Sequence, residues 1–241
     1  MADLISEDVL HEMADYYRQR AGEYDEWFER KGRFDRGPAL NARWFAEAQE
    51  VQTALAPLKV EGDVLELAPG TGIWTRQLLQ TATTITAVDA SPEMLAINRA
   101  RLGNKKITYL QADLFSWQPE RTYDAVCFGF WISHVPLERF PAFVAMVANA
   151  LRPGGKVFFV DSRYEPSSTA VDHTLPGKTE QVMTRKLNDG RTFQIVKNFF
   201  SSPMLHESFA RGGLNVRVEE TPTYFIYGTG TKEAVTYTAT A

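Results

Sequence analysis

The chain has 241 residues, of which 44% are hydrophobic and 23% charged, as in an ordinary globular protein. Its 26 basic and 30 acidic side chains give a net charge of -4 without any basic run, which argues against a nucleic-acid-binding surface. The longest apolar stretch, residues 125–132, is far shorter than a membrane span, and the acidic start does not resemble a signal peptide. One cysteine, Cys127, allows no internal disulfide. We therefore expect a cytoplasmic protein that binds neither membranes nor nucleic acid.

Residues 1–37 hold ten acidic and six basic side chains and so carry the whole net charge. We expect them to form a helical lid segment. Four of their side chains are spaced three or four residues apart and should line one side of a helix: Tyr16, Tyr17, Arg20 and Tyr24. This side either closes over a bound ligand or packs on the core as an aromatic stripe, and the two interpretations are compatible.

The remaining residues, 38–241, are expected to form one domain. After a helix over residues 40–55, short β-branched runs alternate with helical segments. The expected strands are 63–67, 84–89, 107–111, 123–128 and 156–161, and the expected helices between them are 71–80, 92–101 and 137–151. Strict alternation is typical of a parallel sheet with helices on both faces. The pattern predicts a doubly wound, Rossmann-like α/β fold.

The alternation of strands and helices ends at Asp161. A loop over residues 162–178 leads to a β-hairpin, expected as an edge insertion over residues 182–197, with Gly190 in its turn. A helix at 203–211 and strands at 215–220 and 223–227 then complete the sheet.

A glycine-rich turn at residues 66–72, Glu-Leu-Ala-Pro-Gly-Thr-Gly, lies between the first strand and the helix that follows it. Glycine allows a ligand to approach the backbone closely at such a turn. The spacing differs from the dinucleotide fingerprint, so a pyrophosphate is disfavoured. Glu66 would repel phosphates but could orient a cationic ligand.

Carboxylates follow the next two strands. Asp89 ends the second strand, where it can accept both hydroxyls of a ribose, and Asp113 follows the third strand, where it can accept an exocyclic amine. An aspartate after a strand can also be a helix cap or turn residue. Because both stand in register with the glycine-rich turn, we favour a ligand-binding crevice.

These motifs together resemble the class I S-adenosylmethionine (SAM)-dependent methyltransferases over residues 60–227. Residues 66–72 look like the family's first motif, Asp89 like its ribose-binding acid, Asp113 with Leu114 like its adenine-binding pair, and residues 151–155 like the turn before its fifth strand. Ala68 stands where the motif usually has its first glycine. The resemblance implies SAM as cofactor and a mostly parallel seven-stranded sheet with an antiparallel last strand.

A narrower resemblance covers residues 16–25, 74–76, 131–136 and 185–197, and it points to the subfamily that contains the phosphonate O-methyltransferase of dehydrophos biosynthesis. The residues expected to bind the cofactor are Tyr16, Arg20, Tyr24, Glu66, Ala68, Gly70, Gly72, Trp74, Asp89, Ala90, Met94, Asp113, Leu114 and Phe130.

The residues after the fourth strand should face the transferred methyl group, because ligands bind outside the carboxyl ends of parallel strands. Trp131 and His134 are expected to contact the methyl acceptor there. His134 is the candidate general base, since an unperturbed pKa near 6.5 suits proton transfer at neutral pH. The alternative is that His134 only caps a helix or bonds to the backbone.

The hairpin adds two cations. Its alternation predicts an inward face with Met183, Leu187, Phe193 and Ile195, and Arg185 and Lys197 fall on this same face. An unpartnered buried cation is costly, so the two are expected to bind an anionic acceptor. Inward charges that protect a sheet edge from pairing are the alternative.

The sequence therefore predicts a methyltransferase that acts on oxygen of a small acidic metabolite, a phosphonate, phosphate or carboxylate. An N-methyltransferase for a small amine and a non-catalytic SAM-binding regulator remain alternatives. We expect no metal, because no His, Asp or Glu cluster has ligand spacing, and a monomer or homodimer.

Overall fold

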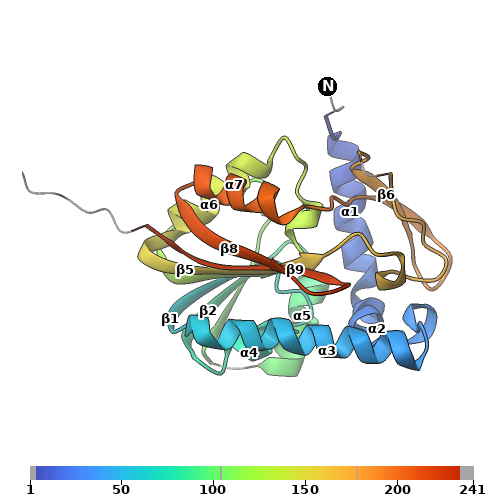
Figure 1. Cartoon of the computed structure of the whole chain (residues 1–241), viewed down its shortest axis with the longest axis horizontal. Coiled ribbons are helices and arrows are strands. Elements are labelled where there is room, and N and C mark those ends of the chain that lie inside the picture. Colours follow the sequence, from blue (N-terminus) through green and yellow to red (C-terminus); the bar gives the residue numbers. More distant parts are fainter. Residues whose placement is uncertain (1–3, 104, 178, 234–241) are drawn as a thin grey trace, which may run out of the picture.

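The computed structural model describes residues 4–103, 105–177 and 179–233. At its centre lies a seven-stranded sheet with the order β3-β2-β1-β4-β5-β9-β8 (Figure 1). Neighbours from β3 to β5 are parallel, whereas β9 is antiparallel to β5 and β8. The strands are β1 (Gly62–Leu67), β2 (Ala82–Asp89), β3 (Ile107–Gln111), β4 (Tyr123–Gly129), β5 (Leu151–Ser162), β8 (Leu214–Glu220) and β9 (Phe225–Lys232). The predicted doubly wound sheet with an antiparallel last strand is confirmed.

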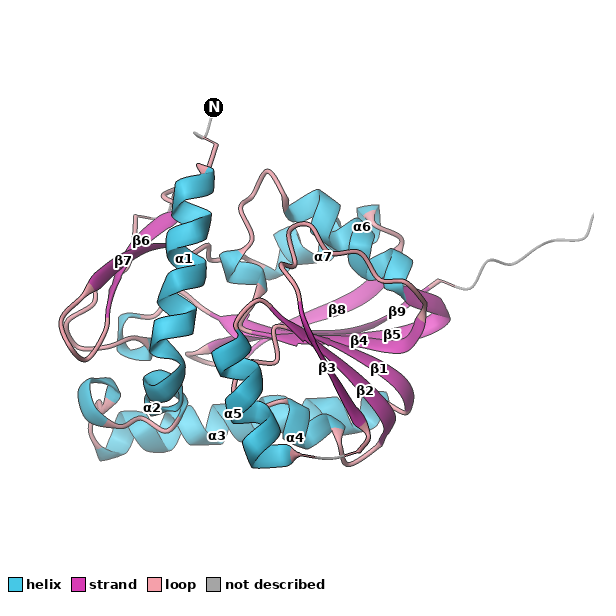
Figure 2. Ribbon diagram, turned by 180° about the vertical axis from the view of Figure 1, so that it is seen from behind, coloured by secondary structure: helices cyan, strands magenta, loops and turns pink. Residues whose placement is uncertain are grey.

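Helices cover both faces of the sheet, with α6 and α7 on one face and α3, α4 and α5 on the other (Figures 1 and 2). The helices are α1 (Glu7–Arg20), α2 (Tyr24–Phe28), α3 (Pro38–Leu55), α4 (Thr75–Leu78), α5 (Pro92–Leu102), α6 (Phe140–Ala150) and α7 (Ser202–Arg211). Among the described residues no helix is long and apolar enough to cross a bilayer.

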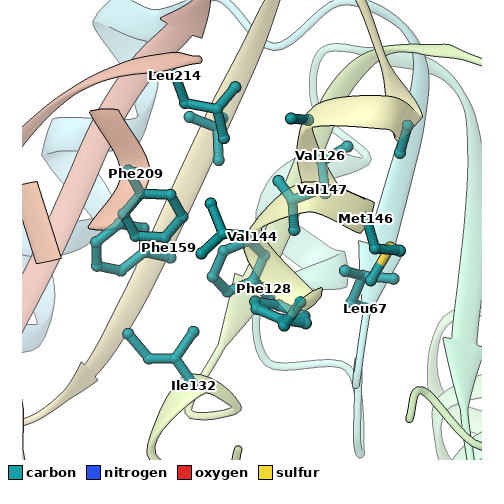
Figure 3. Packing of buried hydrophobic residues seen from close by; sticks show 14 of the residues in the cluster. Leu67, Val126, Phe128, Ile132, Val144, Met146, Val147, Phe159, Phe209 and Leu214 are labelled. Atoms are coloured by element: carbon teal, nitrogen blue, oxygen red, sulfur yellow. The ribbon is translucent and has the colours of Figure 1, made fainter. Parts of the chain in front are cut away.

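The core has one layer on each face because side chains alternate along each strand. On β4, Val126 and Phe128 point toward α6 and α7, while Ala125 and Cys127 point toward α3. On the first face, Phe159 of β5 stacks between Phe128 and Phe209, with ring centroids 5.7 and 5.0 Å away (Figure 3).

Several boundaries differ from those predicted, and two of the differences have a clear physical reason. The helix expected over residues 71–80 is the single turn α4, because Gly70 and Gly72 take positive φ values of 53° and 97° and extend the turn before it. Strand β9 runs to Lys232, five residues beyond its predicted end. Its Gly230 lies against the backbone of Asn215 in β8, where a side chain would not fit.

The predicted inserted hairpin is present, but it does not lie at the edge of the main sheet, as was expected. Strands β6 (Val182–Lys186) and β7 (Thr192–Val196) form a separate two-stranded sheet. This sheet packs against α1 (Figure 2). The buried cluster between them consists of Leu10, Met13, Tyr16, Met183, Leu187, Ile195 and Val196.

Residues 7–28, which form α1, the short turn η1 (Ala21–Glu23) and α2, are called the cover segment below. They lie within the predicted lid of residues 1–37, and the boundary at residue 37 stays a prediction. Residues 1–3 of that lid, and residues 234–241 of the predicted domain, lie outside the described part of the chain.

Glu47 of α3 joins this helix to the far end of the sheet. The side chain is buried, and its Oε2 accepts hydrogen bonds from the Thr221 hydroxyl at 2.5 Å and from the backbone N–H groups of Thr223 at 3.1 Å and Tyr224 at 2.7 Å. One carboxylate thus holds the turn between β8 and β9.

We expect Glu47→Ala to lower the free energy of unfolding by about 3 kcal/mol, because it leaves buried donors without an acceptor. The exposed Glu50, on the same helix, provides the control: Glu50→Ala should change stability by less than about 0.5 kcal/mol. Denaturant unfolding of both variants is the measurement, and equal stabilities would contradict the role of Glu47.

Candidate functional site

A cavity of about 300 Å³ lies at the carboxyl ends of the parallel strands. The segments that follow β1, β2, β3 and β4 form its floor, and α1 covers it. Of the residues predicted for the cofactor, those that line this main cavity are Tyr24, Ala68, Gly70, Asp89, Ala90, Met94, Asp113, Leu114 and Phe130. Trp131 and His134 line it too.

Asp89 connects two walls of the main cavity. One oxygen accepts from the backbone N–H of Gly70 at 3.1 Å and the other from that of Ser91 at 2.9 Å. Burial raises the pKa of the Asp89 carboxyl to about 6, against these hydrogen bonds, which favour the ionised form. The carboxylate is therefore fixed beside the glycine-rich turn.

Two residues on the floor have a strained backbone. Ala68 has a φ of 50° and Phe130 a φ of 56°, in the left-handed region that side chains other than glycine rarely adopt. Such strain concentrates at ligand-binding sites. The positive φ of Ala68 explains why the family motif usually has glycine at this position. Glycine adopts such a φ without a steric penalty.

Five predicted cofactor residues do not line the main cavity: Tyr16, Arg20, Glu66, Gly72 and Trp74. Glu66 is buried on β1, where it bonds to Thr75, and burial raises the pKa of its carboxyl to about 8. Trp74 packs between Gly129 and Phe158. These residues support the floor from behind, and Tyr16 belongs to the cluster between α1 and the hairpin.

A second, smaller cavity adjoins the first, and we call it the cationic cavity. Arg20, Arg185 and Lys197 line it. Both cavities share the side chains of Tyr17, Tyr24, Phe130 and His134. The structure thus brings Arg185 and Lys197 together as predicted for an acceptor site, and it places Arg20 with them rather than in the main cavity.

Lys197 is not the unpartnered cation that the hairpin pattern predicted. Its Nζ donates to the Ser133 hydroxyl at 2.8 Å and lies 3.3 Å from Asp161, both of them buried. Asp161 also accepts from the backbone N–H groups of Ser133 and Ser162. Lys197 and Asp161 therefore form a buried ion pair at the end of β5.

Arg20 and Arg185 form no ion pair with any residue that the structure describes. The Nε atoms of both are buried without a hydrogen-bond partner. Arg185 donates through Nη1 to the Thr169 hydroxyl and lies 2.9 Å from Nδ1 of His173. The Arg20 guanidinium lies over the ring of Tyr24, 5.0 Å from its centroid. One buried and one half-buried positive charge, those of Arg20 and Arg185, thus lack a counter-ion among the described residues.

His134 has both ring nitrogens engaged. Its Nδ1 lies 2.7 Å from the carbonyl oxygen of Val196, which can only accept, so Nδ1 carries the proton. Nε2 then accepts from the Tyr17 hydroxyl at 2.7 Å. Burial, the largest cause, and the positive charge of Lys197, the next largest, lower the pKa of His134 to about 3. The imidazole is neutral at physiological pH and is a weaker base than the sequence suggested.

The sequence analysis did not point to Asp161, and it placed Tyr17 on the ligand-facing or core-facing side of the lid helix without a role in the site. Tyr17 belongs to the aromatic stripe already noted on α1, and Asp161 follows a strand as Asp89 does, so both carried a usable signal. Within residues 4–103, 105–177 and 179–233 no group of three His, Cys, Asp or Glu side chains could hold a metal ion.

Comparisons with known proteins agree with this geometry. Residues 64–155 match a family model described as a methyltransferase domain. Solved structures of DhpI, bound to SAH (S-adenosylhomocysteine) in one case and to SAM and HEP in the other, are 36% and 38% identical in sequence. They cover 95% and 94% of this chain and 99% of DhpI, each with a TM-score of 0.76.

A protein of Bacillus cytotoxicus described as an uncharacterized methyltransferase is 26% identical over 196 residues, which are 79% of this chain and 91% of that protein. The likeness to DhpI extends over nearly both whole chains, and the DhpI complexes hold SAM or SAH. The chain thus belongs to the class I SAM-dependent methyltransferases.

Proposed function

We propose that the enzyme transfers the methyl group of SAM to an oxygen of a small acidic acceptor, a phosphonate, phosphate or carboxylate, held in the cationic cavity. The observation that carries this proposal is the pair of guanidinium groups, Arg20 and Arg185, whose Nε atoms are buried and which lack a counter-ion beside the main cavity among the described residues. A buried cation is costly without an anionic partner, and a guanidinium matches a carboxylate or phosphonate in shape.

The charge balance of the cationic cavity supports an acid rather than an amine. Lys197 is offset by Asp161, and Arg20 and Arg185 remain in excess. A protonated amine would be repelled by this lining, which disfavours the N-methyltransferase alternative. The complex of DhpI with HEP as well as SAM, and the subfamily resemblance to a phosphonate O-methyltransferase, support a small phosphonate.

The main cavity fits the cofactor. Gly70 offers backbone close to the cavity, and the Asp89 carboxylate, fixed beside it, would accept the ribose hydroxyls. Asp113 and Leu114 would contact the adenine, and Ala90, Met94 and Phe130 would complete the lining. When bound, SAM supplies a methyl group on a positively charged sulfur.

The side chains shared by the two cavities mark where the acceptor oxygen would meet the methyl group. Tyr17, Tyr24 and Phe130 present aromatic rings there, which exclude water and favour a neighbouring positive charge. Arg20 and Arg185 would hold the acceptor anion in line, and such alignment supplies most of the acceleration for an activated methyl group. An ionised acceptor needs no base, so the neutral His134 would orient Tyr17.

We expect Arg185→Met to lower kcat/KM for an anionic acceptor by about 10- to 100-fold, since a charged hydrogen bond contributes roughly 1.5 to 3 kcal/mol. Affinity for SAM should not change. Lys186→Met is the matched control, because Lys186 is the next residue on the outward face and pairs with Asp172. Steady-state kinetics and light scattering decide: normal turnover with increased aggregation would favour edge protection over anion binding.

The pH dependence of cofactor binding tests Asp89. The pKa of Asp89 is raised to about 6, so its carboxylate is protonated as pH falls below this value and loses an ionic acceptor for the ribose. Affinity for SAH should fall by up to about tenfold for each pH unit below 6. Calorimetry between pH 5 and 8 measures this, and Asp89→Asn should bind more weakly with no such slope. A wild-type affinity in the variant would remove Asp89 from the ribose site.

The rate profile tests His134. Because its pKa is lowered to about 3, His134 stays neutral from pH 5 to pH 8 and should contribute no inflection to kcat. At saturating SAM and acceptor, wild type and His134→Gln should therefore have profiles of the same shape, with a lower rate in the variant. An acid limb near pH 6.5 in the wild type alone would show that His134 acts as the base.

A further inference from the structure

Asp25 joins the cover segment to the glycine-rich turn. Its Oδ1 accepts a hydrogen bond from the Thr71 hydroxyl at 2.5 Å, and its Oδ2 lies 2.6 Å from Nη2 of Arg101. Nη1 of Arg101 in turn donates to the Thr71 carbonyl oxygen at 3.3 Å. Each of the three residues thus bonds to the other two, and they come from the cover, the turn and the end of α5.

This triangle differs from an ordinary surface ion pair. Thr71 is 1% exposed, and the side chains of Asp25 and Arg101 are 20% and 35% exposed. Isolated exposed pairs contribute little to stability, whereas partly buried charged groups with several hydrogen bonds contribute more. The contact can therefore hold one segment against another.

The triangle holds the residue of the turn that follows Gly70, and this residue has other partners than Gly70 has. The N–H of Gly70 donates to Asp89, and its carbonyl oxygen accepts from Asn98. The side chain and carbonyl of Thr71, the next residue, bond instead to Asp25 and Arg101. A ligand that orders the turn therefore also orders Thr71, the donor of the hydrogen bond that Asp25 of the cover accepts.

Asp25 directly follows Tyr24, which borders both cavities. The ring of Tyr24 lies next to Gly70, so near that a Cβ added there would be 3.9 Å from its Cε1. The same ring supports the guanidinium of Arg20. Fixing Asp25 on Thr71 therefore sets the place of Tyr24 and, through it, one wall of the cationic cavity.

We propose that Asp25 is a positioning residue that ties the cover segment to Thr71, so that cofactor bound at the turn fixes Tyr24 and completes the acceptor site. The consequence for the acceptor rests on the proposed function, but the coupling itself needs only the cofactor cavity. Its test uses SAH alone, so that it can fail or succeed independently of anion binding.

Hydrogen exchange of peptides from residues 7–28, with and without saturating SAH, measures the coupling. In the wild type we expect SAH to slow exchange of the cover at least tenfold. Asp25→Ala should still bind SAH in calorimetry, but SAH should then slow the cover less than threefold. Asp15→Ala is the matched control, because Asp15 is an acidic residue of the same cover segment, in α1, whose side chain is 60% exposed and, among the described residues, pairs with Arg18 alone.

Thr71→Val tests the same contact from the other side and serves if Asp25→Ala does not fold. In Thr71→Val, SAH should no longer protect the cover, as in Asp25→Ala. Thr71→Ser keeps the hydroxyl and should keep the protection. The double variant Asp25→Ala/Thr71→Val should resemble either single variant, because the effects of residues that act as a pair are not additive. The proposal is overturned if SAH leaves the wild-type cover unprotected, if both variants keep full protection, or if Asp25→Ala folds but cannot bind SAH.

Discussion

The parallel alignment of β1, β2, β3 and β4 is the constraint on which the site depends. Parallel strands bring their carboxyl ends to one edge, so four segments distant in sequence meet in one crevice. Gly70 and Asp89 are 19 residues apart along the chain, yet their hydrogen bond closes the floor of the main cavity. The order of these strands therefore sets the spacing between the turn and the carboxylate, which a single loop could not hold as firmly.

The second half of the site is built outside this sheet. The hairpin buries its inward face against α1 through a small apolar cluster, and this packing brings Arg20 of α1 near Arg185 of β6. Holding these guanidinium groups partly or wholly out of water costs free energy in the absence of an anion. The aromatic rings around Arg20 and the Thr169 hydroxyl bonded to Arg185 offset a part of this cost. If the proposed function holds, the fold gives up stability here in exchange for an anion site.

The features of the fold and of the site that depend on neighbouring residues could be predicted from the sequence. Strand alternation, the glycine-rich turn and the period of two in the hairpin depend on neighbouring residues, and each formed as expected. The hairpin's position could not be read, because it depends on apolar side chains of α1 some 170 residues away. The partners of His134 and Lys197 were hidden for the same reason: Tyr17 is 117 residues from His134, and Asp161 is 36 residues from Lys197.

The same buried charges explain both the proposed acceptor and the weak basicity of His134. Lys197 and Arg185 disfavour a second positive charge nearby, and so they lower the pKa of His134 together with burial. A cavity of this kind cannot deprotonate a neutral alcohol or an ammonium ion through His134. The cationic cavity suits the proposed acceptor, which would arrive ionised and serve as the missing counter-ion of Arg20 and Arg185. The proposed selection for acids and the weak basicity of His134 therefore have one electrostatic origin, namely positive charge that the fold holds largely out of water without a full complement of carboxylates.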